Sequence, residues 1–320
     1  MLAACTGDQE TDTGQNPPDQ ITYLTNFGAF GRDSHAYLAD AQGIFAAANI
    51  DVKIELGTGT AGNLTELQAG NAQFVPVDFA GLALTRNEGT RGLVAIAAIQ
   101  QRSLASVMTA DPGITSPLDL AGKKVGLPTG AVTGQLFPVY ASLAGVDLAE
   151  VEQVEMAGNE LIGALASGQV HAIGQFIPGR GTVENVVGKP ITVLPYDEVL
   201  VDQYGVVLVT TRDRAEEDPD LCVRFRDALL AGLEAAVANP EAAGEAIFEA
   251  EPDSAPADVA AEEMRVMEAY VRTSGRPLGE MDEARVVRAL SELTGANALH
   301  VDTDPKDLVA FELPPGQDSE

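Results

Sequence analysis

The residues best able to recognise a small molecule lie in the loop after the first β-like run of the chain. This run, "ITYL" at 21–24, precedes "NFGAFGRDSH", which combines amide, aromatic, guanidinium and imidazole groups. Such groups can hydrogen-bond the polar edge of a ligand and stack on a flat ring. Open α/β sheets bind ligands at the carboxyl ends of their strands. We therefore expect ligand contacts from Asn26, Phe27, Arg32 and His35.

Further candidates follow later β-like runs or begin helical ones. The segment "PTGAVTG" opens a helix, where free backbone N–H groups suit an anionic or carbonyl oxygen. Each candidate has a structural alternative: Asn26 and Thr133 could cap helices, Phe79 could be core, and Arg32 and Asp78 could pair on the surface. The remaining predicted contacts are Asp78, Phe79, Gln100, Gln101, Thr129, Gly130, Thr133, Gln175, Phe176 and Tyr204.

The sequence matches none of the following motifs for catalysis or cofactor binding. The sequence contains no Walker A motif, no nucleophile elbow and no Ser-His-Asp order. The histidines at 35, 171 and 300 lack the close spacing of a metal set. "GTGTAG" at 57–62 fails the dinucleotide spacing and is predicted to form a strand-to-helix turn. We expect no enzyme activity, no metal and no cofactor.

The hydrophobic period along the chain switches repeatedly between that of a strand and that of a helix. β-like runs occur at 21–24, 51–56, 72–78, 93–99, 151–156, 170–176 and 205–211, separated by helical patterns and turn residues. This alternation predicts an α/β fold with mainly parallel sheets flanked by helices. From about 219 to 298 the pattern is almost wholly helical, which predicts a helical C-terminal segment.

Composition limits the partners of the chain. Its 320 residues are 45% hydrophobic, enough for two domains, and its formal net charge is −29. Such a charge opposes binding to nucleic acid and docking on anionic lipid through a basic patch. Solubility explains the charge most simply, and steering of a cationic ligand is the alternative.

Cys5 ends the segment "LAAC", which a polar tether, "TGDQETDTGQNPPDQ", follows. This pattern resembles the bacterial lipobox, whose cysteine is lipidated, although the apolar run and basic region of a signal peptide do not precede it. The alternative is an incidental cysteine in a disordered tail. Cys222 lies in an amphipathic helical run and is predicted to be a small core residue. No segment approaches the length of a membrane span, so a lipid anchor is the only membrane attachment that we expect.

Several motifs in register resemble one protein family. They are "AYLADAQGIFAAANIDVKIEL", "LTELQAGNAQFVPVD", "SPLDLAGKKVGL", "ELIGALASGQVHAI" and "YGVVLVTTRD" with the helical run after it. Together they resemble the ABC-transporter solute-binding proteins of the nitrate, sulfonate and thiamine-pyrimidine branch. The resemblance implies a type II periplasmic-binding-protein fold, an extracytoplasmic location, a small-molecule solute and ABC permease subunits as partners. It also implies a monomer.

The resemblance implies two lobes that close on the solute. Lobe I would comprise 21–104 and 206–320, lobe II 105–205, and 1–20 would be a signal remnant and tether. The chain would cross between the lobes near 103–107 and 203–207. Eukaryotic relatives that make the thiamine pyrimidine carry a cysteine-rich motif linked to iron, which this chain lacks.

The solute class follows from the candidate residues and the resemblance together. Members that bind the thiamine pyrimidine carry an Asn-His pair on the first loop, and His35 is the best match. Aromatic rings, amides and Asp78 favour a flat, neutral or weakly basic heterocycle, such as the aminopyrimidine or a flavin. Sulfonate or nitrate is the alternative. His171 stands where the family commonly has Asp, and either lines the cleft or is held by the backbone.

Overall fold

The computed structural model describes residues 17–273 and 275–314. Cys5, the predicted lipidation site, lies outside these residues. Cys222 is fully buried, so its prediction as a core residue is confirmed. Within the described residues, no helix combines the length and the apolar character needed to cross a membrane.

Five strands before residue 99 and after residue 205 form two small sheets. They are β1 (Asp19–Leu24), β2 (Ile50–Glu55), β3 (Val75–Asp78), β4 (Leu93–Ala98) and β10 (Val206–Thr211). β1 pairs with β2, and β10 lies between β3 and β4. A parallel bridge between Tyr23 and Phe74 joins the two sheets, which gives the order β2-β1-β3-β10-β4.

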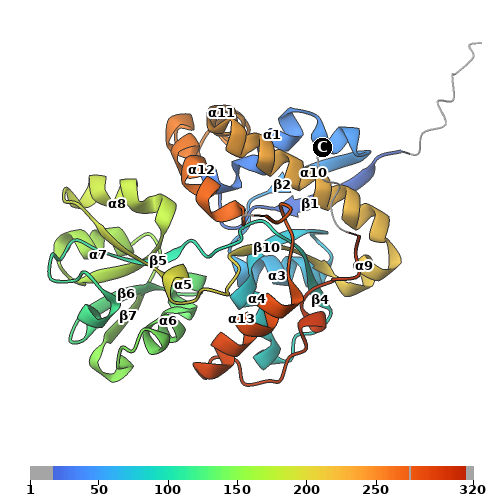
Figure 1. The fold of residues 1–320 in the computed structure, drawn as a ribbon. Helices are drawn as coiled ribbons and strands as arrows, with labels where there is room; N and C mark the ends of the chain where they lie inside the picture. Colours follow the sequence, from blue (N-terminus) through green and yellow to red (C-terminus); the bar gives the residue numbers. More distant parts are fainter. Residues whose placement is uncertain (1–16, 274, 315–320) are drawn as a thin grey trace, which may run out of the picture.

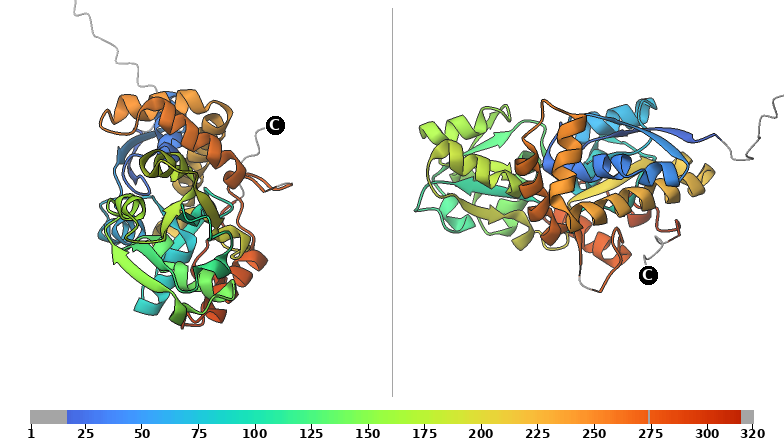
Figure 2. Two further views of the ribbon diagram at one scale, coloured as in Figure 1. Left: turned by 90° about the vertical axis from the view of Figure 1, so that its left-hand side faces the viewer. Right: turned by 90° about the horizontal axis from the view of Figure 1, so that it is seen from above.

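The strands between residues 105 and 195 form one further sheet. They are β5 (Ala105–Thr109), β6 (Lys124–Pro128), β7 (Glu152–Met156), β8 (Ala172–Phe176) and β9 (Thr192–Pro195), in the order β7-β6-β8-β5-β9. The two sets of strands thus share one topology. We call residues 17–98 and 206–314 the small-sheet body and residues 105–198 the five-strand body. Figures 1 and 2 show these bodies side by side.

Strand direction tests the prediction of mainly parallel sheets. β1 with β2, and β6 with both β7 and β8, pair in parallel as predicted. However, β10 is antiparallel to β3 and β4, and β5 is antiparallel to β8 and β9. β5 and β10 are the strands that enter a body directly from a crossing, without a helical connection that would reverse the chain. In each body one strand thus runs against the others, which all point the same way, so the predicted mainly parallel sheets are confirmed.

Helices flank the sheets, as predicted. In the small-sheet body they are α1 (Ser34–Ala41), α2 (Ile44–Ala47), α3 (Thr60–Ala69) and α4 (Phe79–Leu84). In the five-strand body they are α5 (Val132–Gln135), α6 (Phe137–Leu143), α7 (Leu161–Ser167) and α8 (Arg180–Val187). The predicted helical C-terminal segment is confirmed as α9 (Arg212–Glu217), α10 (Pro219–Ala238), α11 (Pro240–Ala250), α12 (Ala257–Val271) and α13 (Glu283–Gly295).

Helix α10 fixes this C-terminal segment to the small-sheet body. Its start is well defined, because Pro219 occupies the first turn and the Asp218 carboxylate accepts the N–H of Leu221. Phe225 then stacks on Phe74 with ring centroids 4.2 Å apart. Burial of one such ring contributes roughly 1.5–3 kcal/mol. The segment after the second crossing is therefore part of this body's core.

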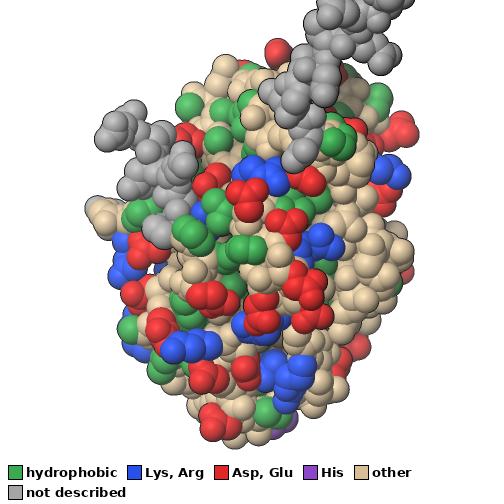
Figure 3. Space-filling model, turned by 90° about the vertical axis from the view of Figure 1, so that its right-hand side faces the viewer, with side chains coloured by type: hydrophobic (Ala, Val, Ile, Leu, Met, Phe, Trp, Pro, Cys, Tyr) green, Lys and Arg blue, Asp and Glu red, His purple; other side chains and the backbone are tan. Residues whose placement is uncertain are grey.

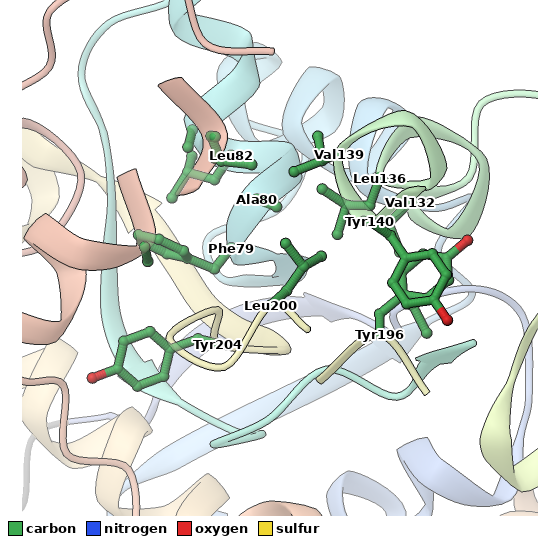
Figure 4. Close-up of a cluster of buried hydrophobic side chains, with 14 of the residues drawn as sticks. Phe79, Ala80, Leu82, Val132, Leu136, Val139, Tyr140, Tyr196, Leu200 and Tyr204 are labelled. Atoms are coloured by element: carbon green, nitrogen blue, oxygen red, sulfur yellow. The ribbon is translucent and has the colours of Figure 1, made fainter. Parts of the chain in front are cut away.

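The two bodies also meet in an apolar seam. Ala80 of α4 lies opposite Val132 of α5, Val139 of α6 and Leu136 between these helices, with Leu200 beside them (Figure 4). All five side chains are buried. A separation of the bodies along this seam would expose apolar surface to water, at about 25 cal/mol per Å².

Charged side chains on the surface are of both signs. On the face seen in Figure 3, acidic groups lie interspersed with Lys and Arg. Arg224 of α10, for example, pairs with Asp220 at 2.7 Å and with Asp19 at 2.8 Å. This pattern suits the interpretation of the net charge as a solubility feature.

Candidate functional site

The loop after β1 is held in place by a side chain from α3. The Asn63 amide donates to the carbonyl oxygens of Thr25 at 2.9 Å, Asn26 at 3.3 Å and Pro76 at 3.0 Å. Position 57 must be glycine, because a Cβ there would overlap the Thr25 carbonyl. "GTGTAG" thus forms the predicted strand-to-helix turn between β2 and α3. Asn63 was not predicted, since its position within a helical run gave no sign of a role in the loop.

Asn26 and Asp33 fix the inner part of the loop. Asp33 accepts the backbone N–H of Asn26 at 2.8 Å, and both residues are buried. Burial raises the pKa of Asp33 from 3.8 to about 6, although the Arg32 charge and the Asn26 N–H lower it. Asp33 was not predicted as a contact, although it follows Arg32 in "NFGAFGRDSH".

Arg32 is the centre of the cluster. Its side chain is 8% exposed, and its Nε lies 3.8 Å from Oδ2 of Asp33. The guanidinium carbon lies 4.5 Å from the ring centroid of Phe30 and 5.1 Å from that of Phe176. Phe30 belongs to the small-sheet body and Phe176 ends β8 in the five-strand body, so Arg32 links the two bodies through cation–π contacts.

Asp78 ends β3 and is 6% exposed. Its backbone N–H donates to Oγ1 of Thr60, the first residue of α3, at 3.3 Å. Burial raises the pKa of Asp78 from 3.8 to about 7, against the charge of Arg32 and the Thr60 hydroxyl, which lower it. Near neutral pH this carboxyl can therefore both accept and donate a hydrogen bond.

Helix α12 adds a third carboxyl group, Glu263, which was not predicted. Glu263 is buried, and burial raises its pKa, whereas the charge of Arg32 and the N–H groups of Gly31 and Arg32 lower it. The approach is close, because a Cβ on Gly31 would overlap the Ala260 carbonyl and lie 2.6 Å from Ala260 Cα. The site thus needs a helix that follows the second crossing.

The cluster has unused hydrogen-bonding capacity. Within the described part of the chain, Arg32 Nε, Asp33 Oδ2 and Glu263 Oε2 are buried without a hydrogen-bond partner. Buried polar groups normally have partners, and each orphan costs about 1–3 kcal/mol. Three buried carboxyl groups interact electrostatically with one guanidinium, so the unpaired capacity suits a ligand that donates hydrogen bonds or carries positive charge.

His35 contacts the backbone of Arg32. It is buried, and its Nδ1 is 3.1 Å from the carbonyl oxygen of Arg32. Because a carbonyl can only accept, Nδ1 carries the proton and Nε2 is an acceptor. Burial lowers the pKa of His35 to about 4, so the ring is neutral. Its visible role is to hold the 3₁₀ turn at Gly31–Asp33.

The other predicted residues of the small-sheet body, and those of the segments that connect the bodies, are not joined to this cluster. Phe27 is 49% exposed and forms a backbone bridge with Thr58 at the rim. Phe79 and Tyr204 are buried and meet edge to face at 5.7 Å. Gln100 and Gln101 use their side chains within the interior: Gln100 accepts the Val206 N–H at 3.3 Å, and Gln101 donates to the Glu280 carbonyl at 2.8 Å.

Among the predicted residues of the five-strand body, some polar groups have hydrogen-bond partners within the protein and others do not. Thr129 is exposed and its N–H donates to Met156, while Gly130 has a φ of 75°. Thr133 is buried with no partner for Oγ1, and its carbonyl accepts from the Tyr196 hydroxyl. The Gln175 side chain accepts the N–H of Phe176 at 2.8 Å. Only Phe176 is tied to Arg32.

His171 takes the second of its two predicted roles. Its Nδ1 accepts the backbone N–H of Lys124 at 2.9 Å. His171 also directly precedes β8, whereas Phe176 is the last residue of that strand, so the two residues lie at opposite ends of the strand. The histidine therefore stabilises the pairing of β6 with β8 and does not face the Arg32 cluster.

Two cavities lie outside the cluster. A groove of about 590 Å³ follows the seam, lined by α3, α4, α5, α6 and the residues after α13. Another cavity, of about 390 Å³, lies between α10 and 309–313. Neither is lined by Arg32 or Asp78. In the described ranges, His, Cys, Asp and Glu side chains form no group suited to a metal ion.

Comparison with known proteins places the chain in a family. The model of the family described as NMT1/THI5 like matches residues 34–243. This match runs from the start of α1 through β2–β10 to the first turn of α11, and so includes most of both bodies. The chain belongs to the NMT1/THI5-like family.

Individual relatives agree with this assignment. The formylaminopyrimidine-binding protein of Halalkalibacterium halodurans is 27% identical over 210 residues, which cover 65% of this chain and 63% of that protein. The periplasmic aliphatic sulphonate binding protein SsuA of Escherichia coli has a similar structure, with a TM-score of 0.75 at 13% identity over 96% of this chain and 95% of that one.

The alkanesulfonate-binding protein SsuA of Xanthomonas axonopodis pv. citri, bound to MOPS, gives a TM-score of 0.67 at 12% identity over 92% and 99%. At such identities these likenesses show the fold alone. The periplasmic-binding-protein fold expected for this NMT1/THI5-like protein is therefore confirmed.

Proposed function

We propose that this protein is the extracytoplasmic solute-binding component of an ABC importer and that it delivers its solute to permease subunits. Family membership and the periplasmic-binding-protein fold support this proposal. In the proposed mechanism, the small-sheet and five-strand bodies are the two lobes. They close on the solute by bending where the chain crosses between them. Capture, rather than chemical conversion, is the task that we assign to the site.

We further propose that the solute is a flat, weakly basic heterocycle of the aminopyrimidine type. The observation that carries this proposal is the Arg32 cluster, in which the buried carboxyl groups of Asp33, Asp78 and Glu263 interact electrostatically with one guanidinium. An exocyclic amine could donate to the carboxyl groups, and a ring could stack near Phe176. The name of the Halalkalibacterium relative gives independent support.

A sulfonate or a similar anion is the competing solute, and Arg32 is the observation that favours it. The unpartnered Nε could bind an anionic oxygen. However, an ionised carboxylate 4 Å from a sulfonate would repel it by about 4 kcal/mol at an effective dielectric constant near 20. The three carboxyl groups therefore make an anion the second candidate.

Calorimetry at neutral pH with the hydroxymethyl aminopyrimidine of thiamine and with ethanesulfonate tests the solute class. We expect the pyrimidine to bind and ethanesulfonate to produce no heat of binding. The reverse result would refute the heterocycle and leave the transport role standing. Release of a modified product from the incubated pyrimidine would instead contradict capture without conversion.

A further inference from the structure

The two segments that connect the bodies pair with each other. The first, 99–104, runs from β4 to β5, and the second, 199–205, runs into β10. The N–H of Gly205 donates to the Gln100 carbonyl at 3.1 Å, and the N–H of Gln100 donates to Val206 at 2.9 Å. A Cβ on Gly205 would lie 2.5 Å from the carbonyl oxygen of Arg102, so the segments pass in close contact.

One side chain, Arg285 of α13, holds both segments. Its Nη1 donates to Oε1 of Gln101 at 3.1 Å, and its Nη2 donates to the Gln101 carbonyl. On the second segment, Nε donates to the Asp202 carbonyl at 3.1 Å and Nη2 to the Gln203 carbonyl at 3.2 Å. The guanidinium carbon also lies 4.0 Å from the ring centroid of Tyr204.

Neighbouring contacts of α13 strengthen this attachment. The Tyr204 hydroxyl accepts the N–H of Asp282, which caps α13. The Gln203 amide donates to the Ala289 carbonyl at 2.6 Å and to Glu292 at 3.1 Å. Burial lowers the pKa of Arg285, against the raising effect of Tyr204 and Asp202. A planar guanidinium can serve these acceptors together, whereas a lysine cannot.

We infer that Arg285 is a hinge clamp, a positioning residue that fixes both connecting segments to the small-sheet body. On the first segment, the last residue that Arg285 holds is Gln101. On the second segment, the first residue that it holds is Asp202. The N–H of Arg102 also donates to the Tyr270 carbonyl of α12 at 3.3 Å, so bending between the bodies is confined to 103–104 and 199–201, on the side of the five-strand body. This inference deepens the proposed function, because the clamp limits the open conformations from which the cleft must close on its solute.

The clamp can be tested without any ligand. Spin labels on cysteines introduced at Gln68 and Ser142, both exposed, report the distance between the bodies in a Cys5→Ala background. Arg285→Lys keeps the charge but loses the fork, and we expect a distance distribution about twofold broader than in the parent protein. Arg265→Lys is the matched control, because Arg265 lies on α12 and its ion pairs are with Glu241 and Glu262, outside both connecting segments. It should leave the distribution unchanged.

A milder variant guards against loss of folding. Gln101→Met removes one acceptor and leaves the other three hydrogen bonds of Arg285, so we expect a smaller broadening. Distributions of parental width in both variants, with near-ultraviolet circular dichroism intact, would overturn the clamp.

A binding experiment separates the clamp from the proposed function. We expect Arg285→Lys to weaken aminopyrimidine binding about fivefold, because more open conformations must be ordered on closure. If the parent protein binds no aminopyrimidine, the solute class fails, while the label distances still decide on the clamp. Broadened distances with unchanged affinity would refute the coupling of the clamp to solute capture.

Discussion

Replacement of Asp78 by Asn removes an ionisable group with little change of shape, and so measures the electrostatics of the buried site. Burial raises the pKa of Asp78 from 3.8 to about 7. A difference of this size corresponds to about 4 kcal/mol between the two protonation states. Ionisation of Asp78 above neutral pH therefore lowers the free energy of unfolding by up to about 4 kcal/mol. Asp78→Asn should recover much of this loss above about pH 7.

The proton count gives the sign of the pH dependence. Between about pH 4 and 7 the folded protein keeps a proton on Asp78 that the unfolded chain has released, so stability falls as pH rises. Asp33, whose pKa burial raises to about 6, acts in the same direction between about pH 4 and 6. Urea unfolding followed by circular dichroism at several pH values measures both. We expect Asp78→Asn to abolish the decline in the free energy of unfolding between about pH 6 and 7. Part of the decline below about pH 6 should remain, because Asp33 still titrates there.

Ligand binding gives a second readout of the same substitution. Loss of the carboxylate should weaken binding of the aminopyrimidine by about 1–3 kcal/mol and should leave ethanesulfonate unaffected or better bound. The Arg32 guanidinium lowers the pKa of Asp78, so Arg32→Met should raise this pKa further. Carbon-13 titration of the Asp78 carboxyl would show this rise. An unfolding profile for Asp78→Asn that parallels the parent protein from about pH 5 to 8 would refute the reasoning.

Three further predictions concern other parts of the chain. Gly31→Ala should destabilise the protein by about 1–3 kcal/mol, since the added methyl group meets α12, whereas Gly163→Ala, whose Cβ would meet nothing within 4 Å, should not. In the ligand-free protein, Leu136→Ser should weaken the seam and increase the radius of gyration in small-angle scattering, and Leu143→Ser at an exposed position should leave it unchanged. Cys5→Ala should release the protein from membranes when it is expressed with its native upstream region. Equal membrane recovery would contradict lipidation.

The order of strands and helices could be predicted because each element carries its own signal. Strand β4 is a continuous apolar run, and all six of its residues are buried. Helix α10 begins at Pro219 after an Asp cap and keeps one apolar face over 20 residues. Pairing direction carries no such local signal, since it depends on how the chain crosses between the bodies. The antiparallel placement of β5 and β10 therefore could not be predicted from the alternation of elements.

Strand ends indicated candidate ligand contacts, but the partners of each side chain decide which candidates belong to the Arg32 cluster. Asp78 and Tyr204 both lie where a strand meets a crossing or a turn, and both were predicted as contacts. Asp78 remains part of the Arg32 cluster, whereas the Tyr204 hydroxyl accepts a backbone N–H and its ring packs on Arg285. Sequence pattern does not distinguish these cases, because the partner of Tyr204 comes from a helix that follows much later in the chain.

The residue missed most completely, Glu263, shows why the site's charge could not be predicted. Within α12 it looks like one of several acidic residues on a solvated helix, since Glu262 precedes it and Glu268 follows. Only the close approach permitted by Gly31 brings its carboxyl group to the N–H of Arg32. That contact adds a third carboxyl group to a cluster that would otherwise hold two around one guanidinium. The preference for a hydrogen-bond-donating solute over an anion thus depends on the packing of a C-terminal helix against the first loop.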